Sequence, residues 1–429
     1  MTNPGTLRAR SRRLDVEVDL VSVAGGSGVL WDSPDTSLAG RGEAARLVVD
    51  RSDPARCAAE VAAFLGAVDT HDELGAPGSG PVALGAWPFD PDRPAELVLP
   101  EILVGSAGDG TRWVTTVLAD GATDDDHDRA VDGLLSDLAD HDERTLAGFS
   151  TSEPLTPSTL SLRTVPDPAA WCAAVAAACE QLRSGVADKV VLAREIVVEA
   201  DDDLPVAAIL RRLRRTFPDA LRFSIDGFVG ASPELLVARV GDIVRCHPMA
   251  GTAPRSGDPA ADARLGAALL ASEKNRVEHR HTIDLVHDTL IGFCSYLDED
   301  AEPSVVAMAN VQHLGTRVQG RLSSPPASVV ELVTVLHPTP AVCGRPRPAA
   351  LELIGRHENI DRGRYAGPVG WVDSAGNGSW AVGIRGAQID GATARVLAGV
   401  GVVADSDPVA ELAETRAKLQ AMLGAIVRP

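Results

Sequence analysis

Hydrophobic and polar positions along the chain follow two periods, and these predict which segments are strands and which are helices. Residues 189–200 form a continuous Val-rich run, which is typical of a buried strand. Residues 205–217 have the apolar spacing of a helix. A helix is also predicted over 167–183, because Asp167 can cap its first turn and a proline follows at the first helical position.

Longer and shorter apolar segments complete this pattern. One long helix is predicted over 261–297, whereas the run at 329–336 is too short to classify by its period. Tight turns at 226–227, 241–242 and 374–378 separate β-rich runs. These turns predict antiparallel hairpins rather than crossovers through helices.

The N-terminal part of the chain has a different pattern. Residues 1–118 mix short apolar runs with Gly and Pro, which favours strands joined by turns. Residues 119–159 begin acidic, contain one short amphipathic helix and end rich in Ser, Thr and Pro, as in a surface connection. We therefore expect residues 1–160 to be a variable N-terminal part of the same α+β domain as residues 161–429.

Composition limits the kinds of partner that the protein can bind. The 429 residues have a net charge of -20, which opposes binding to nucleic acid or to an anionic membrane. The six cysteines lack CxxC spacing and predict reduced thiols. The basic N-terminus has no apolar signal region, and no run of about 18 apolar residues occurs. We expect a cytoplasmic protein that is not exported.

Candidate chemistry begins at 398–415, where a glycine-rich strand end meets a helix start. Gly399 and Gly401 let backbone amides approach an anion, and Glu411 and Glu414 share one helix face. The two acids could hold a divalent cation beside a carboxylate. They could equally be acids that stabilise the N-terminus of an ordinary helix.

Three further charged residues interrupt apolar strands, and each has two interpretations. Arg385 is expected on one face of a strand over 379–389, among Ala and Gly, where it could bind a carboxylate or point to solvent. Glu234 follows Pro233, which marks an edge or bulge, and is either an exposed position or a placed acid. Lys189 is the first residue of its strand, where it is either a catalytic base or an edge residue that prevents aggregation.

A histidine-rich segment over 272–290 could supply metal ligands of two kinds. His279, His281 and His287 would be ligands for zinc, but no cysteine or third ligand has the spacing that would complete such a site. Glu278 together with Glu414 would instead supply oxygen ligands for Mg²⁺.

Eight sequence blocks in order between residues 188 and 420 resemble chorismate-utilising enzymes, most closely the isochorismate synthases. The blocks are DKVVLARE, SPELLV, HPMAGTAPR, SEKNRVEHRHTIDLV, VQHLGTRVQG, LHPTPAVCGRPRPAA, YAGPVGWVDSAGNGSWAVGIRGA and AGVGVVADSDPVAELAETRAKL. The resemblance implies one large domain with two mainly antiparallel sheets packed together, helices outside, and an active site between the sheets. It makes residues 161–429 the chorismate-binding core.

The resemblance also implies roles for individual residues. Lys189 and Glu234 would be the catalytic base and acid on opposite sides of the ring. Glu278 and Glu414, with Glu411 nearby, would bind Mg²⁺, which holds the ring carboxylate. The substrate-binding residues would be Gly251, Thr252, His313, Ala341, Tyr365, Arg385, Gly399 and Lys418. Arg385, Tyr365 and the amides around Gly399 would take the enolpyruvyl carboxylate.

The implied reaction is the reversible conversion of chorismate to isochorismate. Water attacks C2 and the C4 hydroxyl leaves, so one face of the ring needs a base and the other an acid. The pKa of Glu234 must then be raised by burial or by a neighbouring carboxylate. The product would enter menaquinone or catechol siderophore synthesis.

Local residues separate the branches of the family. Lys189 is usually absent from relatives that add ammonia, so we expect water as nucleophile and no glutaminase subunit. Ala250 stands where the aminodeoxychorismate branch carries lysine, and Ala341 resembles the isochorismate type. Three alternatives stay open: a salicylate synthase, a protein that binds chorismate without turnover, and an unrelated metal hydrolase. We expect a monomer.

Overall fold

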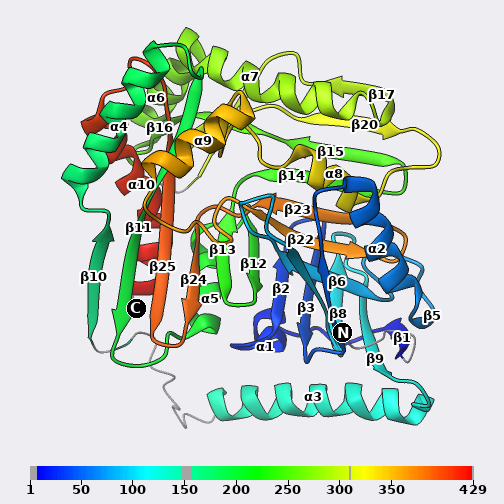
Figure 1. Cartoon of the computed structure of the whole chain (residues 1–429). Coiled ribbons are helices and arrows are strands. Elements are labelled where there is room, and N and C mark those ends of the chain that lie inside the picture. The colour runs from blue at the N-terminus through cyan, green and yellow to red at the C-terminus, as the bar shows by residue number, and fades with distance from the viewer. Residues whose placement is uncertain (1–6, 147–156, 158, 309–310, 428–429) are drawn as a thin grey trace.

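The computed structural model describes residues 7–146, 157, 159–308 and 311–427. Within these residues the chain forms two large β-sheets and one small one, with helices packed around them (Figure 1). Neighbouring strands run mostly antiparallel, whereas β1 and β5 run parallel. The predicted α+β class with mainly antiparallel sheets is therefore confirmed. The third sheet was not predicted.

The strands are as follows. The 13-stranded sheet has the order β10 (Leu160–Val165), β11 (Lys189–Ala200), β25 (Thr393–Val402), β24 (Gly386–Asp390), β13 (Phe228–Ser232), β12 (Leu221–Ile225), β2 (Val29–Asp32), β3 (Thr36–Arg41), β8 (Ile102–Ala107), β9 (Arg112–Ala119), β1 (Leu7–Arg13) and β5 (Asp69–Asp72), with β21 (Gly344–Arg345) beside β11. The nine-stranded sheet has the order β17 (Cys294–Glu299), β20 (Val318–Leu322), β15 (Ile243–His247), β14 (Leu235–Val240), β23 (Gly378–Val382), β22 (Pro368–Asp373), β6 (Val82–Ala86), β7 (Ala95–Leu99) and β4 (Ala45–Val49). The small sheet is β16 (Met249–Pro254), β19 (Val311–Gly315) and β18 (Ser304–Ala307).

The helices lie mainly outside the sheets. They are α1 (Leu20–Ala24), α2 (Pro54–Gly66), α3 (Asp124–Leu146), α4 (Pro168–Arg183), α5 (Val206–Thr216), α6 (Pro259–Ala271), α7 (Glu273–Leu290), α8 (Val329–Leu336), α9 (Arg347–His357) and α10 (Pro408–Val427). The two predicted helices at 167–183 and 205–217 are confirmed as α4 and α5. The Asp167 side chain caps α4 by accepting hydrogen bonds from two backbone amides.

One predicted helix is wrong. The segment 261–297 forms two helices, α6 and α7, and then the edge strand β17. Ser272 separates the helices, because it has an extended backbone and its hydroxyl accepts a hydrogen bond from Asn275 N at 3.4 Å. The short run at 329–336, which its period could not classify, is helix α8. The amphipathic helix predicted within 119–159 is α3, which has 23 residues and is longer than expected.

The three predicted hairpins are present as β12–β13, β14–β15 and β22–β23. The first turns at Asp226 and Gly227, which both have positive φ, as a tight hairpin turn requires. Two of the runs that we expected to be single strands change sheets. The run beginning at Phe228 is split into β13 and β14, and the run over 379–389 is split into β23 and β24.

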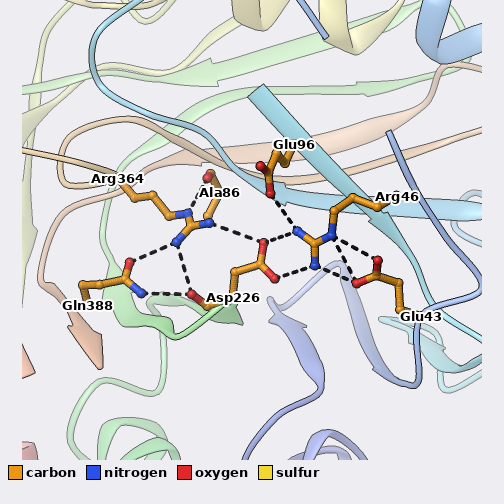
Figure 2. A network of polar contacts seen from close by, with 7 residues as sticks. All are labelled: Glu43, Arg46, Ala86, Glu96, Asp226, Arg364 and Gln388. Atoms are coloured by element: carbon orange, nitrogen blue, oxygen red, sulfur yellow. Dashed lines mark hydrogen bonds and ion pairs between the residues drawn. The ribbon is translucent and has the colours of Figure 1, made fainter. Parts of the chain in front are cut away.

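A polar network fastens the two large sheets at the β12–β13 turn (Figure 2). The carboxylate of Asp226 accepts from both terminal nitrogens of Arg46 on β4, at 2.9 and 3.0 Å. It also accepts from Arg364 Nη2 at 3.4 Å, and Arg364 in turn donates to the Ala86 carbonyl on β6. Such two-pronged arginine contacts hold a fixed geometry. The network holds the loop before β22 against both sheets.

Strands from both sides of residue 160 share both large sheets. β2 pairs with β12, and β6 pairs with β22. The division of the chain at residue 160 stays a prediction. In the described part of the chain, every helix is too short or too polar to cross a membrane. All six cysteines are free, as the sequence predicts.

Candidate active site

Two crossings of the chain between the large sheets create the framework of the site. The first crossing is at Pro233 and Glu234, between β13 and β14, and the second is at Gly383–Arg385, between β23 and β24. At the first crossing, Pro233 has no N–H to donate to a neighbouring strand. At the second crossing the chain passes so close to Gly367 that a side chain at Gly383 would lie 2.7 Å from its carbonyl. The expectation that Arg385 lies within a continuous strand is therefore wrong. Arg385 has a φ of 55° and lies in the crossing itself.

One cavity of about 140 Å³ lies between these crossings, the small sheet, α7 and α10. Every site residue that the family resemblance implies lines it: Lys189, Glu234, Gly251, Thr252, Glu278, His313, Ala341, Tyr365, Arg385, Gly399, Glu411, Glu414 and Lys418. They come from segments up to 229 positions apart, from 189 to 418. The structure thus brings the predicted residues together, while their chemical roles stay predictions.

Lys189 begins β11 at the wall of the cavity, where its residue is 9% exposed. Its Nζ lies 2.5 Å from Glu278 Oε1 of α7. Gly401 lies on the paired strand β25, and a side chain there would overlap Lys189 Cε. The alternative of a solvated edge lysine is therefore disfavoured. The glycine at 401, which we expected to admit an anion, leaves room for the lysine side chain.

Glu234 is a buried acid, with 4% of its surface exposed. Its backbone is held from both sides, because Glu234 N donates to Ser232 Oγ at 3.2 Å and Val382 N donates to the Glu234 carbonyl at 3.1 Å. Burial raises the pKa of its carboxyl to about 8, against the opposite effects of the Met249 backbone and the positive charges of Lys189 and Lys418. Glu234 is thus largely protonated at neutral pH and can donate a proton.

Arg385 and His313 form a second polar group in the cavity. Arg385 Nη2 lies 3.3 Å from His313 Nε2, and His313 Nδ1 lies 3.3 Å from the Gly251 carbonyl and 3.1 Å from Thr252 Oγ1. Arginine can only donate, so Nε2 accepts and the proton is on Nδ1. Burial, together with Arg385 and Lys418, lowers the pKa of His313 to about 3. The imidazole is neutral and leaves the positive charge to arginine.

Tyr365 and Lys418 complete the wall beside β25. Burial raises the pKa of Tyr365, so its hydroxyl stays protonated although Arg362 and Arg385 oppose the shift. A side chain at Gly399 would lie 3.0 Å from Val191 Cγ1 and 3.2 Å from the Tyr365 hydroxyl, so these neighbours would have to shift slightly to admit it. Lys418 Nζ donates to the Gly399 carbonyl at 3.0 Å. β25, Tyr365 and α10 therefore form one continuous part of the cavity wall.

The expected metal ligands line the cavity, but they do not form a ready-made cluster. Among the described residues, no group of three His, Cys, Asp or Glu side chains converges as metal ligands would. Glu278 pairs with Lys189, and Glu414 pairs with Lys418 at 2.7 Å. The donor set still fits Mg²⁺, which is usually held by one or two carboxylates together with water and substrate oxygens.

The weak zinc alternative finds no support in the geometry of α7. His279 is buried and its Nε2 contacts Thr316 Oγ1 at 2.7 Å, whereas His281 Nδ1 lies 2.6 Å from Arg345 Nη1. The two imidazoles are engaged with different partners. A lining residue that sequence reasoning missed is Asn275, which packs under Gly251 from the first turn of α7. Its position in the SEKN block is the signal that could have found it.

Fold and cavity together define an α+β protein with a small cavity between its sheets that is lined by acidic and basic side chains. A family model described as "Chorismate binding enzyme" matches residues 18–427. The chain belongs to this family.

Relatives of known name support the same assignment. The isochorismate synthase DhbC of Bacillus subtilis is 35% identical over 359 residues, covering 81% of this chain and 81% of the relative. The isochorismate synthase MenF of the same organism is 33% identical over 371 residues, covering 81% and 75%. The solved structure of MenF, the menaquinone-specific isochorismate synthase from Escherichia coli, has a TM-score of 0.78 at 26% identity, covering 97% of this chain and 94% of that one.

Proposed function

We propose that this protein is an isochorismate synthase that converts chorismate reversibly to isochorismate by adding water at C2 and releasing the C4 hydroxyl. The observation that carries the proposal is the cavity itself, in which the Lys189 amine, the protonated carboxyl of Glu234 and the Arg385 guanidinium face one small space. Two of the relatives that share most of this chain carry that name.

The reaction needs a base on one side of the ring and an acid on the other. We assign Lys189 as the base that takes a proton from the attacking water. Glu234 donates its proton to the leaving hydroxyl, which its raised pKa permits at neutral pH. In the reverse direction the two groups exchange protonation, so the same site catalyses both directions.

The substrate carries two carboxylates into a protein of net charge -20, so local positive charge must hold it. We assign the enolpyruvyl carboxylate to Arg385, Tyr365 and the amides around Gly399. The planar guanidinium matches a carboxylate with two parallel hydrogen bonds. Neutral His313 accepts from Arg385 and so fixes the direction of the guanidinium without adding charge.

We assign Mg²⁺ as the cofactor, held by Glu278 and Glu414 with Glu411 nearby. The ion supplies Lewis-acid polarisation and orientation of the ring carboxylate when it is bound. We further propose a cytoplasmic monomer that needs no glutaminase subunit and binds neither nucleic acid nor membranes.

The test is incubation of purified protein with chorismate and Mg²⁺, with the products resolved by chromatography. Isochorismate as product supports the proposal. Salicylate with released pyruvate would instead identify a salicylate synthase, and unchanged chorismate would contradict both. Glu234→Gln serves as the matched control, because it keeps the shape of the side chain but removes the acid.

A further inference from the structure

A buried ion pair lies directly behind the active-site wall and has no part in the chemistry described above. Arg362 and Glu358 follow α9, and their side chains are 4% and 3% exposed. Arg362 Nη2 lies 2.5 Å from Glu358 Oε1, and Nε donates to Glu358 Oε2 at 2.8 Å. The guanidinium also stacks on the Phe89 ring, 4.2 Å from its centroid. The pair is therefore rigid and shielded from water.

This pair fills a gap in the largest sheet. One edge of β11 pairs with β21 at residues 189 and 190 and with β10 at residues 195–200, which leaves residues 191–194 without a strand neighbour on that side. Arg362 Nη2 donates to the Val191 carbonyl at 2.8 Å, and Glu358 Oε1 accepts from Ala193 N at 2.6 Å. The two side chains satisfy these two backbone groups in place of a strand, while the Val191 amide donates to the Cys343 carbonyl at 2.8 Å and the Ala193 carbonyl accepts from Trp171 Nε1 at 3.2 Å.

The filled stretch is the part of β11 that lies at the cavity. It begins two residues after Lys189, and on its other edge Ala193 pairs with Gly399 of β25. A buried backbone group that loses its partner costs free energy, and the strand can recover this only by moving. A shift of β11 would displace the amine of Lys189.

The same pair reaches two more segments of the wall. Arg362 Nη1 donates to the Val342 carbonyl at 2.9 Å, next to Ala341. The Arg362 carbonyl accepts from Tyr365 N at 2.9 Å. One residue further, Ala366 N donates to the Gly383 carbonyl at 2.7 Å, at the crossing that carries Arg385.

We propose that Arg362 and Glu358 are positioning residues for the proposed reaction: their buried ion pair holds β11, the loop at Ala341 and the loop at Tyr365 in one arrangement around the cavity. The inference rests on the proposed function for its kinetic part only. Arginine is required, because its fork meets one carboxylate and two carbonyls at once and lysine cannot span them.

The test compares two conservative variants with a matched control elsewhere in the chain. Arg362→Lys keeps the charge but loses the fork, and Glu358→Gln keeps the shape but loses the charge. The control is Arg222→Lys. Arg222 is also buried, pairs with Asp32 at 2.8 Å, and donates to the carbonyls of Phe217 and Pro218 at 2.9 and 2.7 Å. It lies outside the lining of the cavity.

We expect all three variants to melt at lower temperature than the wild type. Measured well below these midpoints, kcat falls about 10²-fold in Arg362→Lys and in Glu358→Gln, because a displacement of about 1 Å of a catalytic group has that effect. KM for chorismate changes less than kcat, because the strand that directly loses hydrogen bonds is β11, which carries the proposed base Lys189. In Arg222→Lys both kcat and KM stay at wild-type values.

Amide hydrogen exchange of the free protein provides a second readout that does not depend on turnover. We expect faster exchange at residues 189–194, 341–343 and 363–367 in the two site variants and not in the control. Wild-type kcat and KM in folded Arg362→Lys and Glu358→Gln would overturn the proposal. If the wild type itself does not convert chorismate, the proposed function fails. Unchanged amide exchange in these three segments of the two site variants would overturn the positioning role separately.

Discussion

Glu234→Gln should change the stability of the protein in a way that depends on pH. The wild-type carboxyl is buried and its pKa is raised from 4.5 to about 8, chiefly by burial. Between these two values the folded protein holds a proton that the unfolded chain has released. The free energy of unfolding of the wild type must therefore fall as pH rises from about 4.5 to about 8.

The size of this effect follows from the two pKa values. A difference from 4.5 to about 8 corresponds to at most on the order of 5 kcal/mol, because one pKa unit is 1.36 kcal/mol. Water that enters the cavity when the carboxyl ionises makes this free-energy difference smaller. The glutamine variant cannot ionise, so it lacks this loss. Its stability relative to the wild type should rise by several kcal/mol from pH 5 to pH 9.

Urea denaturation of both proteins at pH 5, 7 and 9 measures this difference. All other titrating groups are shared, so their contributions cancel when the variant is compared with the wild type. A stability difference that is the same at all three pH values would refute the reasoning, since it would mean that Glu234 ionises as easily in the folded protein as in the unfolded chain.

Four further predictions concern catalysis. Gly401→Ala should lower kcat about 10²-fold, because the added methyl group overlaps Lys189 Cε; wild-type kcat would show that the strand yields without effect. Lys189→Ala should lower turnover about 10²- to 10⁴-fold while chorismate still binds in a calorimeter, and unchanged turnover would reject Lys189 as the base. Glu414→Ala should lose both activity and its dependence on Mg²⁺ in a metal titration, which normal saturation by the metal would contradict. The wild-type kcat/KM should fall above about pH 8 as Glu234 loses its proton, and a level profile to pH 9 would exclude it as the acid.

The residues of the candidate site could be predicted from the sequence, whereas the backbone crossings and side-chain contacts that hold them in place could not. Motif blocks carry the identity of cavity residues such as Lys189 and Glu414, and these blocks converge in the structure. Alternation of apolar residues did not reveal the crossings at Glu234 and Arg385, since a strand that changes sheets keeps its apolar character on both sides. Only Pro233 hinted at the first of them.

Other failures have equally local causes. Ser272 ends one helix and caps the next, and an apolar period that continues across a cap hides such a break. The pair of Arg362 and Glu358 gave no periodic signal, because its partners are backbone carbonyls and amides of distant segments. The pairing of Lys189 with Glu278 depends on tertiary packing between β11 and α7, which spacing along the chain does not encode.

Reaction of the purified protein with chorismate and Mg²⁺ in water enriched with ¹⁸O tests the central claim most directly. Mass spectrometry of the product should show isochorismate with one solvent-derived oxygen at C2, because the hydroxyl at C4 leaves and water supplies the new one. Isochorismate without the label would contradict water as nucleophile, and salicylate with pyruvate, or unreacted chorismate, would contradict the assignment of the enzyme.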